Sequence, residues 1–271
     1  MPALSPGLRY IDSIVKSTSI EQAWQIHTTK MAQYGFDRVL YGANKYRTHG
    51  DFGDLSDALI LTNHDSDYVD LFFGKAFYLH APMTQWVAHN TGVCSWQWSF
   101  DRRDAGLLSD QELEIIAIND KMGVHAGVSI SFSQIHERAA SAIGLCARRG
   151  ISQKEADDIF GQHGAEIEVY NNVFNQKIMS LPFERSGKKL TPRQREVLHW
   201  IADGKTLQDI AIILGLTQAT IEKHVRLARE TLNADTTAQA ILKASLNNQF
   251  FVFEGLQAQA VSPGDVARRV T

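Results

Sequence analysis

The part of the sequence that most constrains the fold lies near the C-terminus, where a single glycine separates two amphipathic segments. Thr206 precedes a segment whose apolar residues recur at helical spacing up to Leu214, Gly215 follows, and Thr217 precedes a longer segment. Thr is a favoured helix N-cap, and Gly readily adopts the left-handed conformation that ends a helix. Two helices joined by a turn of about four residues form a helix-turn-helix unit. The sequence therefore predicts such a unit here.

The segment after Thr217 has two chemically distinct faces. At about 100° per residue, one side carries only apolar residues, which are Ile221, Val225, Ala228 and Leu232. The other side carries a short residue followed by charged ones, which are Ala219, Lys223, Arg226 and Glu230. This combination predicts a buried seam and an outer face that can approach base edges. The same pattern also fits an ordinary amphipathic surface helix.

A set of polar residues on this segment is predicted to contact duplex DNA: Thr217, Gln218, Thr220, Glu222, Lys223, His224 and Arg226. The first of them would lie at the positive end of the helix, where hydroxyl and backbone N–H groups suit a phosphate. The distribution of charge along the chain also favours DNA binding by the C-terminal part. Residues 184–246 hold ten Lys and Arg against seven Asp and Glu, whereas residues 1–183 hold 15 against 21. A polyanion would therefore bind the C-terminal part.

Residues 190–241 closely resemble, without a gap, the DNA-binding domain of LuxR-type transcription factors. The matching residues are Leu190-Thr191-Pro192-Arg193, Glu196-Val197-Leu198, Ile201-Ala202, Gly204-Lys205-Thr206, Ile210-Ala211, Leu214-Gly215, Thr217, Thr220-Ile221, His224-Val225, Leu232 and Gln239-Ala240. The resemblance implies an all-α domain of four helices, a recognition helix in the major groove of promoter DNA, and a homodimer formed through the last helix. It also makes RNA polymerase and other LuxR-type proteins candidate partners.

Four residues depart from the pattern of that family. Gln194 stands where Glu is usual, Glu222 where Lys or Arg is common, and Thr231 and Thr237 where Lys and Arg are common. Glu222 would repel a phosphate, or accept a hydrogen bond from a cytosine amine if it reached a base edge. Two functions stay open. The chain is either a sequence-specific regulator or a ligand-independent interaction module that heterodimerises with another LuxR-type regulator and titrates it.

A short polar run, Glu184-Arg185-Ser186-Gly187-Lys188-Lys189, separates this region from a long helical stretch, Lys154–Ser180. Such a run is typical of a linker. The predicted organisation is a sensor and dimerisation domain at residues 1–183, a linker at 184–189, the helix-turn-helix domain at 190–247 and a C-terminal extension at 248–271.

Upstream of the linker, helix and strand patterns alternate without the rhythm of a parallel sheet. Helices are expected over Ile11–Tyr34, Asp67–Tyr78, Pro82–Asn90, Ser109–Met122 and the stretch before the linker. Strands are expected over Arg38–Tyr41, Ala58–Thr62, Cys94–Phe100, Gly127–Phe132 and Ala140–Cys146. These elements predict an α+β domain, a sandwich of helices around an antiparallel sheet of about five strands.

Residues 20–180 resemble the autoinducer-binding domain of LuxR-type receptors, which binds N-acyl homoserine lactones in quorum sensing. The resemblance rests on the order of elements, on Tyr34-Gly35-Phe36-Asp37 and on Gly127-Val128-Ser129-Ile130. Carried over residue by residue, it implies a ligand pocket that includes Tyr68, Phe72, Ala81 and Trp96, and Trp98 is expected on the same strand face as Trp96. For most aromatic residues here a place in the core is the stronger interpretation; Tyr68 and Trp96 are the exceptions, because each carries a polar group.

One position of the implied pocket removes a hydrogen-bond acceptor. Ala81 stands where the family's Asp accepts the amide N–H of the lactone. An unpaired buried amide costs about 1–3 kcal/mol, so the sequence predicts an atypical or orphan receptor that binds ordinary acyl homoserine lactones poorly. His80, the neighbouring residue, is the first candidate for a replacement acceptor. A different small molecule, and a receptor that folds without any ligand, are the other two hypotheses.

Other classes of function are not favoured. Cys94 and Cys146 have no CxxC or metal-ligand spacing, and no HxxxH or HExxH motif occurs, so neither a metal nor a cofactor is expected. No GxSxG, P-loop or GxGxxG motif suggests an enzyme. No stretch reaches the ~18 apolar residues of a membrane span, and no signal-like N-terminus is present. A cytoplasmic protein without a membrane partner is expected.

Overall fold

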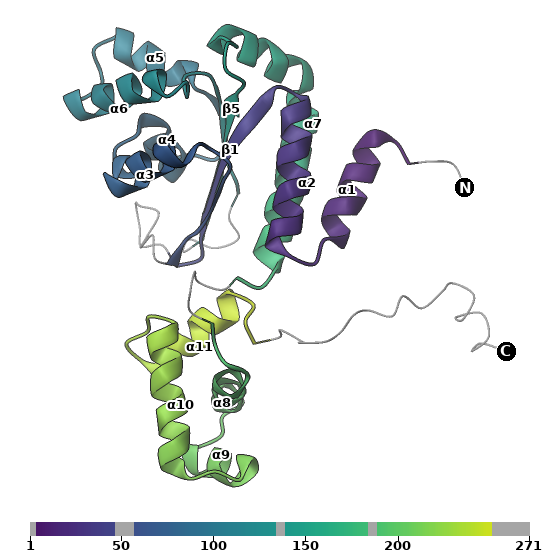
Figure 1. Ribbon diagram of the computed structural model, residues 1–271, viewed down its shortest axis with the longest axis vertical. Helices are drawn as coiled ribbons and strands as arrows, with labels where there is room; N and C mark the ends of the chain where they lie inside the picture. Colours follow the sequence, from purple (N-terminus) through teal and green to yellow (C-terminus); the bar gives the residue numbers. More distant parts are fainter. Residues whose placement is uncertain (1–3, 47–56, 134–138, 184–188, 251–271) are drawn as a thin grey trace, which may run out of the picture. The chain divides into compact units, whose positions relative to one another are not determined.

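The computed structural model describes residues 4–46, 57–133, 139–183 and 189–250 (Figure 1). The chain divides into two compact units, residues 1–187 and residues 188–271. The predicted linker and C-terminal extension lie largely outside the described residues. Within the described parts of the chain, no helix is both long and apolar enough to cross a membrane.

The N-terminal unit is built on one antiparallel sheet of five strands in the order β2-β1-β5-β4-β3. The strands are β1 (Phe36–Asn44), β2 (Leu59–Thr62), β3 (Gly92–Ser95), β4 (Gly127–Ser131) and β5 (Ala140–Ala147). Tyr41 is in register with Leu61 on β2 and with Ile143 on β5. The predicted α+β class, with about five antiparallel strands, is confirmed.

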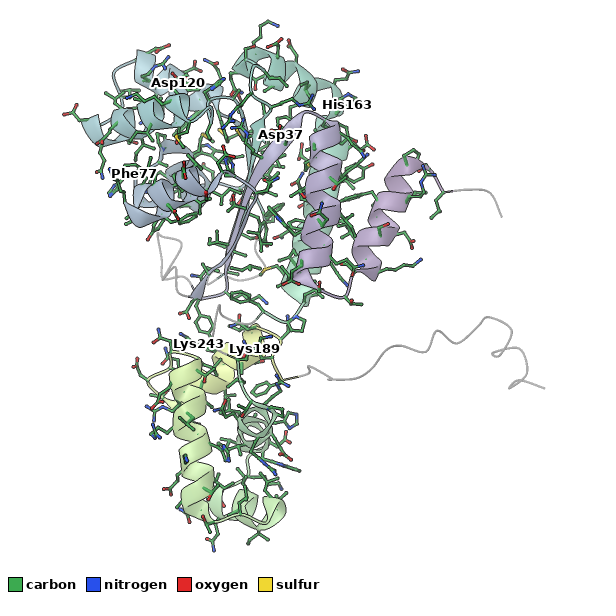
Figure 2. The ribbon with its side chains drawn as sticks, viewed as in Figure 1. Asp37, Phe77, Asp120, His163, Lys189 and Lys243 are labelled. Atoms are coloured by element: carbon green, nitrogen blue, oxygen red, sulfur yellow. The ribbon has the colours of Figure 1, made fainter. Side chains whose placement is uncertain are left out.

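Helices cover both faces of this sheet (Figure 1). One layer contains α1 (Pro6–Lys16), α2 (Ile20–Gln33) and α7 (Gln153–Ser180). The other contains α3 (Ser66–Gly74), the short 3-10 helix η2 (Phe77–Leu79), α4 (Pro82–His89), α5 (Gln97–Asp104) and α6 (Asp110–Lys121). Phe77 and Asp120 mark the second layer in Figure 2, and His163 marks the first. The domain is therefore a three-layer sandwich.

Three predicted elements are wrong. The helix expected over Asp67–Tyr78 ends at Gly74 as α3, and Ala76, in the left-handed conformation with φ of 56°, separates it from η2. The strand expected over Cys94–Phe100 ends at Ser95, and α5 begins two residues later. Ser95 Oγ accepts a hydrogen bond from the backbone N–H of Gln97 at 3.0 Å, which turns the chain away from the sheet. The single helix expected over Ile11–Tyr34 is two helices, because Ser19 caps a new one by accepting from the Gln22 N–H at 3.1 Å. The strand expected to end at Gly42 continues to Asn44.

The two faces of the sheet differ in the size of their side chains. Successive residues of a strand point to opposite faces. Toward α1, α2 and α7 the strands present large buried side chains, which are Phe36, Val39, Tyr41, Val128, Ile130, Ile143 and Leu145. Toward α3, α4 and α6 they present mostly small residues, which include Gly42, Ser129, Ala142 and Gly144. The first face is closed, and the second leaves space.

The C-terminal unit contains α8 (Pro192–Ala202), α9 (Leu207–Leu214), α10 (Gln218–Thr231) and α11 (Thr237–Leu246). Thr191, Thr206 and Thr217 cap the first three by accepting a hydrogen bond from the N–H three residues later. Gly215 ends α9 in the left-handed conformation, with φ of 65°. The seam predicted on α10, formed by Ile221, Val225, Ala228 and Leu232, is buried. The predicted four-helix domain is confirmed.

Candidate functional site

The first candidate site is the outer surface of α10. All seven residues predicted to contact DNA lie on this helix or at its N-cap: Thr217, Gln218, Thr220, Glu222, Lys223, His224 and Arg226. Thr220 and His224 are partly buried, and the other five are exposed. The two threonines at the helix start are linked, with 2.9 Å between their Oγ1 atoms. Their hydroxyls lie beside the N–H groups of the first turn, where an anion is favoured.

The charged side chains of this face are mostly paired with each other. Arg226 Nη1 lies 2.5 Å from Glu230 Oε1, and Gln218 Nε2 donates to Glu222 Oε1 at 3.0 Å. Both contacts are solvent-exposed and therefore weak, so a DNA phosphate or base edge can replace them at little cost. Lys223 is exposed and has no ion-pair partner within the described residues. The face thus presents one unpaired cation and one cation held by a neighbouring acid.

The second candidate site is a cavity of about 810 Å³ on the open face of the sheet in the N-terminal unit. Its floor is formed by small residues of β1, β4 and β5, and its walls come from α3, α4, α5 and α6. Large apolar side chains line most of it, including Leu40, Ile60, Phe73, Val87 and Ile116. A mostly apolar cavity with a few polar groups is the usual form of a small-molecule site.

Four of the five predicted ligand residues line this cavity: Tyr68, Phe72, Ala81 and Trp96. Trp98 does not. It lies on α5, and the Arg102 guanidinium sits 5.0 Å from its ring centroid. The difference follows from the strand that ends early. On a strand Trp96 and Trp98 would share a face, but at the start of a helix they point in different directions.

The side chains of Tyr68 and Trp96 each form a hydrogen bond within the protein. Tyr68 Oη donates to Asn119 Oδ1 at 3.2 Å, and Trp96 Nε1 donates to Ser129 Oγ at 2.9 Å. Burial raises the pKa of the Tyr68 hydroxyl, so it remains protonated. Ser129 and Asn119 also line the cavity. The inner wall therefore offers neutral hydrogen-bonding groups.

Ala81 occupies two structural roles at once. It lines the cavity with 5% of its surface exposed, and it is the N-cap residue of α4, where no side-chain hydrogen bond caps the helix. Asp is among the best N-cap residues and Ala among the poorest. An Asp here could cap the helix, whereas the methyl side chain of Ala81 cannot.

Among the described residues, two histidines line the cavity, His64 and His125, and His80 is not one of them. His80, the first candidate for a replacement acceptor, is exposed and is not part of the lining. His64 lies just before the start of α3, four residues ahead of Tyr68, and the two ring centroids are 4.9 Å apart. Burial, together with the nearby Arg38 charge, lowers the pKa of His64 to about 4. Helical spacing does not identify it, because His64 lies before the first residue of α3.

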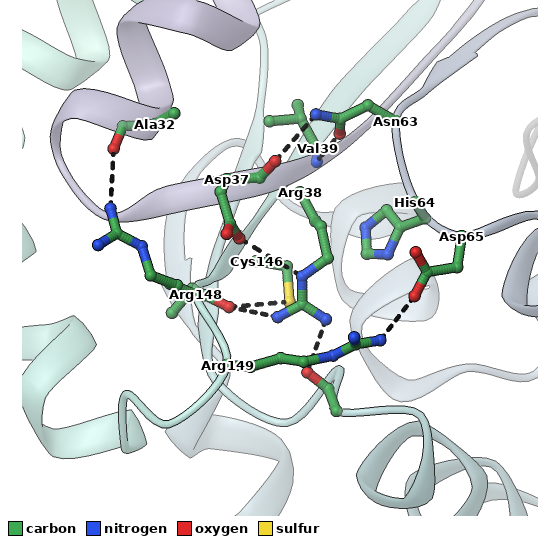
Figure 3. Close-up of polar contacts among 12 residues, drawn as sticks. Ala32, Asp37, Arg38, Val39, Asn63, His64, Asp65, Cys146, Arg148 and Arg149 are labelled. Carbon is green, nitrogen blue, oxygen red and sulfur yellow. Dashed lines mark hydrogen bonds and ion pairs between the residues drawn. The ribbon is translucent and has the colours of Figure 1, made fainter.

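The residues on either side of His64 are fixed to the sheet and to the β5–α7 loop (Figure 3). Asn63 accepts from the Val39 N–H at 2.6 Å and donates to the Asp37 carbonyl at 2.9 Å. Asp65 pairs with Arg149 at 2.6 Å. These contacts hold the backbone of His64 in place.

The buried Arg38 side chain lies near His64 and keeps its own charge engaged (Figure 3). Its guanidinium donates to the carbonyls of Gly123 and Ala147 at 2.8 and 2.5 Å, and lies 3.4 Å from Asp37 Oδ1. Arg38 is not part of the cavity lining. No group of three His, Cys, Asp or Glu side chains in the described part of the chain is arranged to hold a metal.

Two protein-family models match the chain. The autoinducer binding domain covers residues 19–178, and the model of bacterial regulatory proteins of the luxR family covers residues 188–244. These ranges contain the cavity and α10, respectively. The second family consists, by its description, of bacterial regulatory proteins.

Named relatives agree with these models. The transcriptional activator YukR of Yersinia ruckeri is 42% identical over 197 residues, which is 68% of this chain and 83% of YukR. The transcriptional activator ExpR of Dickeya dadantii is 22% identical over 63% of this chain and 70% of ExpR. The match to the quorum sensing-dependent regulator RpaR of Rhodopseudomonas palustris, 37% identical, spans only 28% of that protein.

A solved structure shares the fold. It is the N-acylhomoserine lactone-dependent LuxR family factor CepR2 of Burkholderia cenocepacia, with a TM-score of 0.51 and 16% identity over 65% of this chain and 97% of CepR2. At that identity the likeness concerns the fold alone. The family models and the YukR match go further, and on them this chain belongs to the LuxR family of quorum-sensing transcriptional regulators.

Proposed function

We propose that the chain is a homodimeric regulator that binds promoter DNA through α10 and senses a small molecule in the cavity of its N-terminal domain. The DNA-binding part rests on the outer face of α10, where Lys223 and Arg226 follow a helix start with paired hydroxyls. A single domain with few basic residues neutralises few phosphates, so a dimer is needed for tight binding.

Two variants of the full-length chain test the placement of α10 on DNA. Arg226→Ala should relax sequence preference, because a bidentate base contact is worth roughly 1–3 kcal/mol of discrimination. Thr217→Ala should weaken binding to all sequences alike and destabilise α10 by about 1 kcal/mol. Mobility shifts with promoter and random duplexes at matched salt measure both. Unchanged discrimination in Arg226→Ala would contradict this docking.

The sensing part rests on the cavity itself. A space of about 810 Å³ with apolar walls and neutral polar groups would accommodate a small amphiphilic molecule. Because Ala81 supplies no acceptor, we expect ordinary acyl homoserine lactones to bind poorly, which makes the chain an atypical receptor. Mass spectrometry of small molecules that co-purify with the protein is the direct test.

The role of Ala81 has its own experiment. Ala81→Asp should add the acceptor and improve binding of a decanoyl homoserine lactone by about 1–3 kcal/mol. Thermal melts of both proteins with that lactone measure the change. A rise of several degrees in the unmodified protein at low-micromolar lactone would show that another residue accepts the amide N–H.

A second function is favoured by the charge of the α10 surface. Glu222 and Glu230 offset Lys223 and Arg226, so the outer face carries no net charge. Such a face suits a module that binds DNA weakly and titrates another LuxR-type regulator through heterodimers. Absence of a mobility shift, together with lost DNA binding by an added LuxR-type regulator, would favour it over the first function.

A further inference from the structure

Glu222 is an exposed carboxylate on the surface of α10 that carries the predicted DNA contacts. Arg226, one turn further along the helix, pairs with Glu230 instead, at 2.5 Å. Within the described residues Glu222 has no ion-pair partner, and it accepts a hydrogen bond from Gln218 Nε2 at 3.0 Å. A carboxylate has two oxygens with about four lone-pair sites. Most of the acceptor capacity of Glu222 is therefore free.

The position of Glu222 around the helix axis places it beside Arg226. At about 100° per residue, Glu222 lies about 40° from Arg226 and about 60° from Ala219. Ala219 is exposed and carries only a methyl group, so it does not keep another surface away from this part of the helix. Glu222 and Arg226 therefore belong to the same strip of α10, and both would enter the groove if the helix docks there.

The major groove offers a carboxylate few hydrogen-bond donors. Only the amines of cytosine and adenine donate there, whereas guanine and thymine present acceptors. The adenine amine lies next to the acceptor N7, which would repel a carboxylate. Cytosine has no acceptor on its own edge, and Glu commonly accepts from its N4 amine. A carboxylate at this position therefore favours cytosine over the other three bases.

Gln218 adds a donor next to this acceptor. The Nε2 amide group carries two hydrogens, and one of them is directed to Glu222. In a C·G base pair the guanine O6 acceptor lies next to the cytosine amine. A carboxylate oxygen beside an amide N–H matches the order of donor and acceptor across that base pair.

We propose that Glu222 reads a cytosine of the operator, that Gln218 donates to the guanine paired with it, and that Arg226 reads a guanine in the same half-site. Residues 222 and 226 are about 6 Å apart along the helix axis. This distance corresponds to about two base-pair steps of ~3.4 Å. The half-site should therefore contain a C and a G one or two steps apart. This inference rests on the proposed DNA-binding function of α10.

The test is selection of bound duplexes from a randomised library by the full-length protein and its variants. Glu222→Gln replaces the carboxylate with an amide, which suits adenine, and should change the selected base at one position from cytosine to adenine. Glu222→Arg should change the same position to guanine. Competition mobility shifts with the four duplexes that differ at that position should show about a five- to tenfold preference for cytosine in the unmodified protein.

Control variants assign the preference to one side chain. Glu196→Gln removes the same charge from an exposed residue of α8 and should leave the selected base unchanged. Gln218→Ala should weaken the cytosine preference about two- to fivefold without changing the base. Glu222, Gln218 and Glu196 are all exposed, so the variants should fold, and thermal melts verify this.

The outcomes separate this inference from the proposed function. If Glu222→Gln selects the same sequences as the unmodified protein, or binds all of them more tightly by one common factor, Glu222 acts only through its charge. The base reading is then wrong and the DNA-binding function stands. Selection of a base other than cytosine at the responding position also contradicts it. If the unmodified protein enriches no sequence, the DNA-binding function fails and this inference fails with it.

Discussion

The two faces of the N-terminal sheet are formed by the same strands, but one is closely packed and the other borders the cavity. On one face Tyr41 and Ile143 are fully packed against α2 and α7. Their sequence neighbours, Gly42 and Gly144, lie on the other face and form part of the cavity floor. Large and small residues thus alternate along β1 and β5. The tightly packed core therefore lies on one side of the sheet and the cavity on the other, so substitutions can change one without the other.

The largest expected difference between the faces comes from removing an aromatic ring on each. Phe174 is fully buried on the closed face, stacked on His27 with 4.0 Å between ring centroids. Phe174→Ala should destabilise the protein by about 3–5 kcal/mol. Phe72→Ala should cost less than half as much, because part of its surface borders existing space and has fewer contacts to lose. The free energy of unfolding of both variants is measured in urea. Equal losses of stability would contradict the expected difference between the two faces of the sheet.

The closed face contains a buried histidine, His27, which should make the stability of the protein depend on pH. His27 accepts from Tyr10 Oη at Nδ1, with 2.7 Å between the atoms, and its Nε2–H donates to Asn171 Oδ1 at 3.1 Å. Burial lowers the pKa of His27 to about 3. Below pH 6.5 the unfolded chain therefore binds a proton that the folded chain does not, and stability falls with pH until about 3.

Between pH 7 and 4.5 the loss attributable to His27 should be about 2–3 kcal/mol. The measurement is the free energy of unfolding across that range. His27→Gln is the control and should show a shallower pH dependence. The same steepness in the variant would assign the effect to other groups, such as His64.

Two glycines on neighbouring strands provide a smaller test. A Cβ at Gly127 would lie 2.3 Å from the Leu145 carbonyl oxygen, whereas a Cβ at Gly144 would meet nothing closer than Trp96 Cζ2 at 3.8 Å. Gly127→Ala should therefore destabilise by about 1–3 kcal/mol. Gly144→Ala should be neutral or stabilise by up to about 1 kcal/mol, because it restricts the unfolded chain. Thermal melts of the two variants measure the difference. A large fall in the melting temperature of Gly144→Ala would show that the space beside Gly144 does not accept a methyl group.

The smallest expected effect is at Ala81, the N-cap residue of α4. Ala81→Ser should stabilise the ligand-free protein by about 0.5–1 kcal/mol, because the hydroxyl can cap α4. Ala81→Val is the matched control and should give no such gain. A melting temperature equal to that of the control would mean that the α4 terminus is capped by water already.

The sequence predicted the parts of this molecule that depend on local chemistry. Three Thr N-caps and Gly215 identify the helix starts and the turn of the C-terminal unit, and these signals act within a few residues. The strand and helix errors occurred where tertiary context decides. Alternation over Cys94–Phe100 looked like a strand, but a serine hydroxyl turned the chain at Ser95.

The cavity was predictable only in part for the same reason. Tyr68, Phe72, Ala81 and Trp96 were identified by resemblance, and the cavity lining includes them. His64 was not identified, because its place in the lining depends on contacts of Asn63 and Asp65 with residues far away in the sequence. Spacing along a helix cannot report contacts to a strand on another element.

The uncapped start of α4 has an evolutionary consequence. Codons for Ala and Asp can differ by a single base, and residue 81 is both the N-cap of α4 and part of the cavity lining. The gain of a cap and the cost of a buried carboxylate act in opposite directions, so such a change moves overall stability little. A single substitution at this position can therefore change a polar group of the cavity lining without unfolding the domain.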